Sequence, residues 1–103
     1  MKKFTAALLV GAAALAFTVT AQAEPDGEAI YNQACMACHM TGAAGAPIKG
    51  DADAWAPRLE QDMDTLYAHS IEGFGAMPPK GGHMNLSDEE VKAAVDFMLE
   101  PVL

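Results

Sequence analysis

Apolar residues recur every three or four positions in three stretches of the chain, a spacing typical of amphipathic helices. The first stretch opens at Pro25-Asp26, and its stripe contains Gly27, Tyr31, Ala34, Cys35 and Cys38. The second opens at Pro57 and extends to Gly73 or Gly75, with a stripe of Leu59, Met63, Leu66, Tyr67, Ser70 and Phe74. The third follows the capping box Ser87-Asp88-Glu89-Glu90 and ends at Pro101. No alternating strand pattern occurs after residue 23, so we predict an all-α domain.

Two loops rich in glycine and proline separate these stretches. The first covers residues 40–53 and includes Pro47. The second covers residues 75–82 and reads Gly-Ala-Met-Pro-Pro-Lys-Gly-Gly. Because a proline restricts the residue before it to extended geometry, Met77 is expected to be held rigidly.

The first 23 residues have the pattern of a secretory signal peptide. A basic start at residues 1–3 is followed by an apolar run from Phe4 to Thr20 and by Ala21-Gln22-Ala23. The alternative is an uncleaved membrane anchor, but the run is short for a span of about 20 residues. We predict cleavage after Ala23, export, one domain over residues 24–103, and no stable membrane insertion afterwards.

The predicted mature chain is strongly acidic. Residues 24–103 hold all fourteen acidic residues but only four of the six Lys and Arg residues, a formal charge of −10. This charge argues against nucleic acid or an anionic membrane as a partner. It would steer the chain toward basic patches on a partner protein, unless the acidity serves solubility alone.

A domain of 80 residues buries only about 60% of the surface that its unfolded chain exposes, so its stability is marginal without a staple or cofactor. The two cysteines, Cys35 and Cys38, are too close in sequence for a disulfide between them to constrain much of the chain. The pattern Cys35-Met36-Ala37-Cys38-His39 is instead typical of covalent haem attachment. Two thiols add to the two vinyl groups, and the histidine reaches the iron. A thioredoxin-like motif would need a βαβ setting, and a structural zinc site would need four ligands.

Met77 is the expected second axial ligand, with Met84 as a competitor in a more polar setting. Ligation by methionine and histidine raises the reduction potential of the iron relative to more basic ligand pairs. A filled sixth coordination position indicates electron transfer rather than catalysis. Pro47 is expected to offer its carbonyl to the ring N–H of His39, although a simple turn proline remains an alternative. Trp55 and Arg58 could donate to haem propionates, and Trp55 could also pack in the core, a role compatible with such donation.

Several motifs together resemble class I c-type cytochromes, most closely the small bacterial cytochrome c5 group. They are Asp26-Gly27-Glu28, the motif at residues 35–39, Ala46-Pro47, Trp55-Ala56-Pro57-Arg58, residues 73–82 and residues 86–98. The resemblance implies three to four helices around one covalent haem c, with the first and last helices crossing near Gly27 and Phe97. It also implies His39 and Met77 as iron ligands, and a periplasmic single-electron carrier between respiratory complexes and terminal oxidases or reductases.

Two other functional classes stay open: a haem sensor or peroxidase-like enzyme with a labile sixth ligand, and an electron-entry module of a larger complex. One departure from the resemblance matters here. Many cytochromes c5 carry a second cysteine pair before the last helix, whereas this chain reads His83-Met84-Asn85-Leu86. We therefore expect a looser loop, in which His83 or Met84 could replace Met77 under some conditions.

Overall fold

The structure is a computed structural model, and it describes residues 24–103. The predicted signal peptide, residues 1–23, lies outside the described residues. The α-helices are α1 (Gly27–Ala34), α2 (Met36–His39), α3 (Ala52–Trp55), α4 (Met63–Glu72) and α5 (Asp88–Leu99). Short 3₁₀ helices are η1 (Ala43–Gly45), η2 (Arg58–Glu60), η3 (Pro79–Gly82) and η4 (Glu100–Val102). Residues 24–103 form no strand beyond one isolated bridge between Phe74 and Met77, which confirms the predicted all-α fold.

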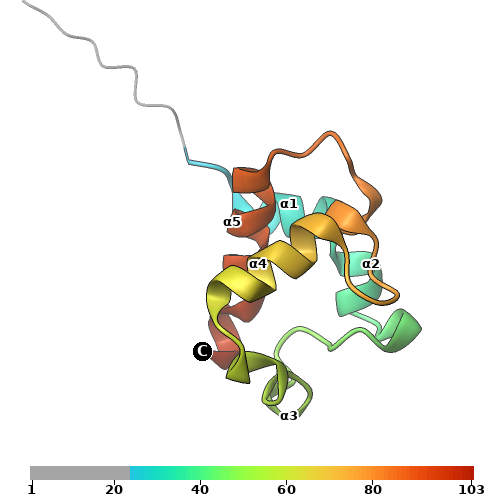
Figure 1. Ribbon diagram of the computed structural model, residues 1–103, viewed down its shortest axis with the longest axis vertical. Coiled ribbons are helices and arrows are strands. Elements are labelled where there is room, and N and C mark those ends of the chain that lie inside the picture. The colour runs from blue at the N-terminus through green and yellow to red at the C-terminus, as the bar shows by residue number, and fades with distance from the viewer. Residues whose placement is uncertain (1–23) are drawn as a thin grey trace, which may run out of the picture.

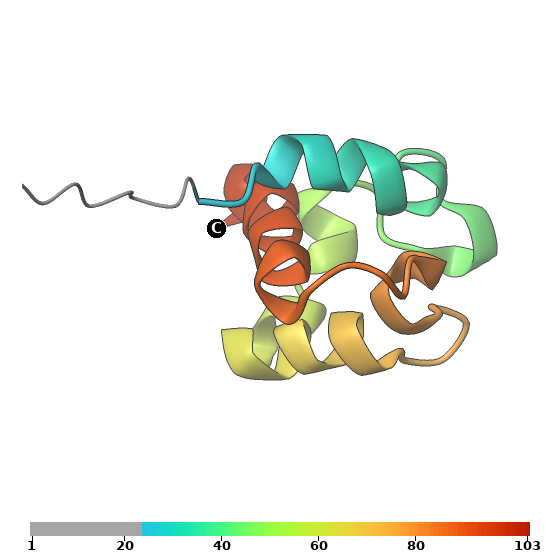
Figure 2. The same cartoon turned by 90° about the horizontal axis from the view of Figure 1, so that it is seen from above.

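The C-terminal helix α5 is the centre of the fold. Figures 1 and 2 show α1 on one side of α5 and α4 on the other, and both helices pack against it. At the α1–α5 crossing, a Cβ on Gly27 would overlap the carbonyl oxygen of Ala93 and lie 3.2 Å from Cβ of Phe97. Gly27 is therefore inside a helix because the close crossing excludes a side chain, as the resemblance implied.

The expected caps fix where two of these helices begin. The Asp26 side chain accepts a hydrogen bond from the Ala29 N–H at 3.2 Å and begins α1. Ser87 and Glu90 form the predicted reciprocal capping box at α5, with distances of 2.8 and 3.1 Å. These bonds satisfy backbone donors that the first helical turn leaves unpaired.

The predicted second helix is shorter than its apolar spacing indicated. Gln61 is extended, with ψ of 158°, and α4 begins only after Asp62, whose side chain accepts from the Thr65 N–H at 2.9 Å. The helix ends at Glu72 because Gly73 adopts φ of +92°. Phe74 lies beyond this end and is 62% exposed, so its assignment to the buried stripe was wrong.

The core is small and lies mostly along α5. Ten hydrophobic side chains are buried: Ile30, Tyr31, Trp55, Leu66, Leu86, Val91, Ala94, Val95, Met98 and Leu99. A hydrogen bond from the Tyr67 hydroxyl to the Asp96 carboxylate also joins α4 to α5. These contacts close one side of the domain and leave a cavity on the other.

Candidate functional site: a haem pocket

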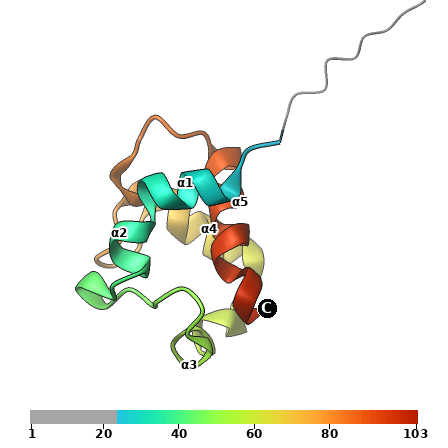
Figure 3. The same cartoon turned by 180° about the vertical axis from the view of Figure 1, so that it is seen from behind.

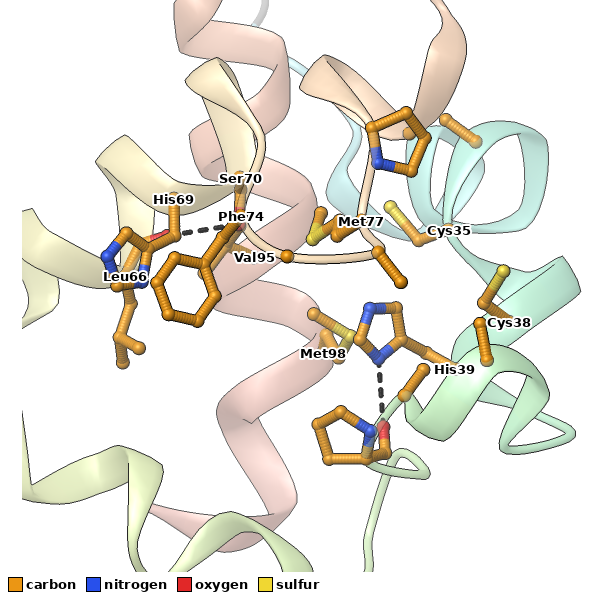
Figure 4. Close-up of a pocket in the computed structure, with 18 of the residues that line it drawn as sticks. Cys35, Cys38, His39, Leu66, His69, Ser70, Phe74, Met77, Val95 and Met98 are labelled. Atoms are coloured by element: carbon orange, nitrogen blue, oxygen red, sulfur yellow. Dashed lines mark hydrogen bonds between the residues drawn. The ribbon is translucent and has the colours of Figure 1, made fainter.

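The cavity has a volume of about 390 Å³ and is bordered by six parts of the fold. They are the end of α1 with α2, the loop of residues 43–47, the α3–η2 segment, α4 with the Met77 loop, the end of η3 with His83, and α5. Figures 2 and 3 show how these segments enclose one end of the molecule, and Figure 4 shows the side chains. Ligand pockets commonly have volumes of about 300–1,000 Å³, so a cofactor-sized group fits here.

Cys35 and Cys38 both line the cavity, as free thiols. Cys35 occupies the turn between α1 and α2, where its N–H donates to the Tyr31 carbonyl at 2.9 Å. Cys38 lies within α2 and is exposed at the cavity rim. Burial raises the pKa of the Cys35 thiol to about 11. A reactive redox cysteine instead needs a lowered pKa, so this environment does not favour the thioredoxin-like alternative.

His39 is the last residue of α2 and is 6% exposed. Its Nδ1 lies 2.8 Å from the Pro47 carbonyl oxygen, which can only accept a hydrogen bond (Figure 4). Nδ1 therefore carries the proton, and the lone pair is on Nε2. Burial lowers the pKa of His39, while the Pro47 bond opposes this effect and the charge of Arg58 adds to it. The resulting neutral imidazole is the form that binds a metal.

The loop after α2 is organised around His39. The Lys49 N–H donates to the His39 carbonyl at 2.7 Å, which brings Pro47 beneath the ring. The bond expected between Pro47 and His39 is thus present, and the role of Pro47 toward a bound haem stays a prediction.

Trp55 packs beside this histidine, with ring centroids 5.9 Å apart and planes inclined by 20°. Its indole N–H donates to the Ile48 carbonyl at 3.0 Å, so that donor already has a partner inside the protein. The structure therefore favours the packing role for Trp55 over donation to a propionate. The tryptophan fixes the loop that carries Pro47 and forms part of the cavity wall.

Arg58 also borders the cavity and is exposed. One of its N–H groups, on Nη1, donates to the Ala54 carbonyl at 2.7 Å. A guanidinium has five N–H donors, so this bond leaves others to meet a carboxylate at the cavity. The propionate role of Arg58 stays a prediction.

Met77 reaches the cavity from a tight turn after α4 (Figure 4). Phe74 and Met77 exchange both backbone hydrogen bonds, at 3.0 and 2.9 Å. A Cβ on Gly73 would lie 3.0 Å from the Pro79 ring and 3.1 Å from the Met77 carbonyl oxygen. Pro79 and the Met77 carbonyl therefore pack closely against Gly73, and the backbone at Met77 has little conformational freedom. Met84, its sequence competitor, is 65% exposed and does not line the cavity.

The sequence did not identify every residue that borders the cavity. His69, which helical spacing places beside the apolar stripe of the second stretch, is half-buried, lines the cavity, and stacks on Phe74 with ring centroids 3.9 Å apart. Met98 and Ser70 are buried and also line it. Helical spacing placed Ser70 on an inward face, but periodicity cannot separate a residue facing a cofactor from one facing the core.

The donor set fits a haem. Two thiols and an imidazole with a lone pair on Nε2 come from one end of α1–α2, and a thioether comes from a separate turn; all four line one largely apolar cavity. Among residues 24–103, no three His, Cys, Asp or Glu side chains are grouped so that they could hold a metal ion. The zinc alternative thus lacks a donor set in the part of the chain described. No helix within that part is long and apolar enough to span a membrane.

Comparison with known proteins agrees with this geometry. The family model described as "Cytochrome C oxidase, cbb3-type, subunit III" matches residues 22–98. Cytochrome c-555 of Chlorobaculum tepidum is 47% identical, with 96% of both chains covered. Cytochrome c5 of Azotobacter vinelandii is 43% identical over 70% of this chain and 89% of its own.

Solved structures show the same fold. A cytochrome c in an electron transfer complex with nitrite reductase is 44% identical, with a TM-score of 0.71, and covers 80% of this chain and 100% of its own. A mono-haem ferrocytochrome c from Shewanella putrefaciens is 46% identical, with a TM-score of 0.63, over 71% and 90% of the two chains. The chain therefore belongs to the c-type cytochromes that this family model describes, as a class I member similar to cytochromes c5 and c-555, and it is an electron carrier with one covalently bound haem c.

Proposed function

We propose that this protein is a periplasmic single-electron carrier in which His39 and Met77 ligate the haem iron. Its electrons would pass between respiratory complexes and terminal oxidases or reductases. The observation that carries the proposal is the convergence of Cys35, Cys38, His39 and Met77 on one cavity, from segments more than thirty residues apart in the chain.

The bound haem supplies an iron that gains and loses one electron without a change in covalent bonding. Cys35 and Cys38 anchor its edge through thioethers. Pro47 fixes the His39 ring by accepting from Nδ1, which directs Nε2 into the cavity. The Met77 turn presents a thioether from another wall. His39 and Met77 would both hold the iron and leave no coordination position open for a substrate, so we propose that the chain is not an enzyme.

Charge distribution supports a two-part mode of docking. The segments 36–48 and 73–79 border the cavity and contain none of the fourteen acidic residues and none of the lysines or arginines. Exposed small or apolar residues of these segments form the rim, which we define as Ala37, Cys38, Ala43, Ala44, Phe74 and Ala76. We propose that the acidic surface steers the protein toward basic patches on a partner, and that the rim makes the short-range contact.

The sequence pattern of residues 1–23 supports the proposed periplasmic location. The basic, apolar and small-residue segments within residues 1–23 match a cleaved signal, and haem attachment would follow export. The mature protein would then be residues 24–103.

An optical spectrum of the purified protein, oxidised and reduced, tests the ligand set, and an intact mass tests the processing. We expect a sulfur-to-iron charge-transfer band in the oxidised protein, no carbon monoxide binding when reduced, and the mass of residues 24–103 plus one haem. A five-coordinate high-spin spectrum would support the haem sensor or peroxidase-like alternative instead.

A second candidate is the electron-entry module of a larger complex, because the matching family model is described as an oxidase subunit. Gel filtration of a cell extract separates the two. A freely diffusing carrier elutes as a small protein, whereas a module co-elutes with its complex.

A further inference from the structure

Lys80 has an unusual environment for a lysine in so acidic a chain. Its side chain is 16% exposed, and its Nζ donates to the Leu86 carbonyl at 2.6 Å. The same ammonium lies 3.3 Å from the Asp88 carboxylate, in the first turn of α5. In residues 24–103 the one other ion pair joins Lys92 to Glu89 at 3.9 Å, and both of those side chains are more exposed, at 42% and 76%.

The backbone at this lysine is in a conformation that L-residues rarely adopt. Lys80 has φ of 55°, and Gly81 and Gly82 follow with φ of 62° and 90°. Such a conformation at a non-glycine residue costs free energy and persists where surrounding contacts determine it. Gly81 supplies one such contact, because a Cβ there would overlap the Ala34 carbonyl oxygen at the end of α1.

The consequence of this backbone is that η3 is held from two sides. Gly81 packs against the end of α1, and the Lys80 ammonium joins the segment to Leu86 and to the first residue of α5. Lys80 also borders, together with Met77 and Ser70, a second small cavity of about 10 Å³ inside the core. The lysine stem therefore packs within the same group of side chains as the methionine.

We infer that Lys80 is the positioning residue for Met77: it is a non-covalent clip that keeps the methionine turn closed over the haem pocket. The clip spans residues 80–88, which include the segment that the sequence indicated would be loose. The inference rests on the proposed role of Met77 as the sixth ligand. Loss of the ammonium should increase how often the turn opens, while the rest of the fold stays intact.

The test measures the rate at which imidazole binds to the oxidised holoprotein at 25 °C, because imidazole can reach the iron only when Met77 has left it. Lys80→Met keeps the aliphatic stem and removes the ammonium. We expect imidazole to bind at least tenfold faster to this variant, with a weaker charge-transfer band. Lys80→Arg keeps a long cation and should bind imidazole at a rate within about threefold of wild type.

Lys92→Met is the matched control, since it removes the same charge from the more exposed ion pair, and its rate should stay within twofold of wild type. Asp88→Asn, paired with Glu89→Gln as its control in the same helical turn, gives a second comparison if Lys80→Met does not fold. Only Asp88→Asn should bind imidazole faster. A purely structural role would lower the melting temperature of Lys80→Met without a faster imidazole reaction than Lys92→Met shows.

The outcomes separate the two proposals. If the wild-type protein lacks the charge-transfer band, the Met77 assignment fails and this inference fails with it. If the band is present but Lys80→Met and Lys92→Met react alike, only the role of Lys80 is overturned.

Discussion

The haem-free chain should be largely unfolded, and the structure shows why. Replacing Cys35 and Cys38 with alanine prevents covalent attachment. The protein's own side chains then enclose a cavity of about 390 Å³ with a mainly apolar lining. At about 24 cal/mol per Å³, leaving this volume unfilled costs about 9 kcal/mol. The cavity opens to solvent on one side, so this figure is an upper bound.

That cost is as large as the whole stability of a domain of this size. At about 0.05–0.15 kcal/mol per residue, 80 residues give roughly 4–12 kcal/mol of unfolding free energy. Water that enters the open side recovers little of this cost, because a mostly apolar wall offers it few hydrogen-bond partners. Without haem, the domain is therefore expected to lose all or most of its free energy of unfolding.

Far-UV circular dichroism with a thermal melt checks this prediction. We expect the double alanine variant to show low helicity and no cooperative transition, while the haem-loaded wild type melts cooperatively under the same conditions. A cooperative transition above 40 °C in the haem-free variant would refute the reasoning, because it would mean that α5 and its neighbours form a sufficient core alone.

Three further predictions address the ligand, the surface charge and the helix contacts. Met77→Ala should abolish the charge-transfer band of the oxidised protein, while Met84→Ala, at a residue 65% exposed, should keep it; the opposite result would reassign the ligand. Electron self-exchange between copies of charge −10, measured by NMR, should become faster as salt screens their repulsion, whereas transfer to a cationic partner should slow; salt-independent rates would mean that the acidity serves solubility. The hydrogen bond to Asp96 raises the pKa of Tyr67 to about 12 from 10.0 in an unfolded chain. The folded state therefore holds the Tyr67 proton more tightly than the unfolded chain does. The stability that this hydrogen bond contributes is complete below pH 10 and is lost between pH 10 and 12. Denaturant titrations should show a smaller loss over this range in Tyr67→Phe, and equal losses would exclude the bond as the cause.

Local features of the sequence predicted much of the fold. The spacing at Gly27 and Tyr31, the capping box at Ser87 and the proline-rich turn at Met77 each act over a few residues, so they can be identified without tertiary contacts. The start of α4 was missed because Pro57 and Asp62 both suit a helix start, and the periodic pattern runs through both. Only the packed chain shows that Gln61 is extended and divides the stretch into η2 and α4.

The same limit applies to the site. His69 lies beside the apolar stripe of its helix, which suggested a surface position, yet it stacks on Phe74 at the cavity. The Trp55 N–H could have met either a propionate or the protein itself, and it bonds to Ile48. Hydrogen-bond partners of this kind are set by where a loop returns to the core. A linear pattern does not contain that information.

The sequence by itself determined that a haem is attached, because the spacing of Cys35, Cys38 and His39 is a local pattern that can be recognised without knowing the fold. The prolines that follow Met77 also predict it as the second ligand, and this role stays a prediction. Only the tertiary structure places Met77 and the motif at residues 35–39 on the walls of one cavity. Nearly forty residues separate these two parts of the site, and the packing of α1 and α4 against α5 brings their segments together.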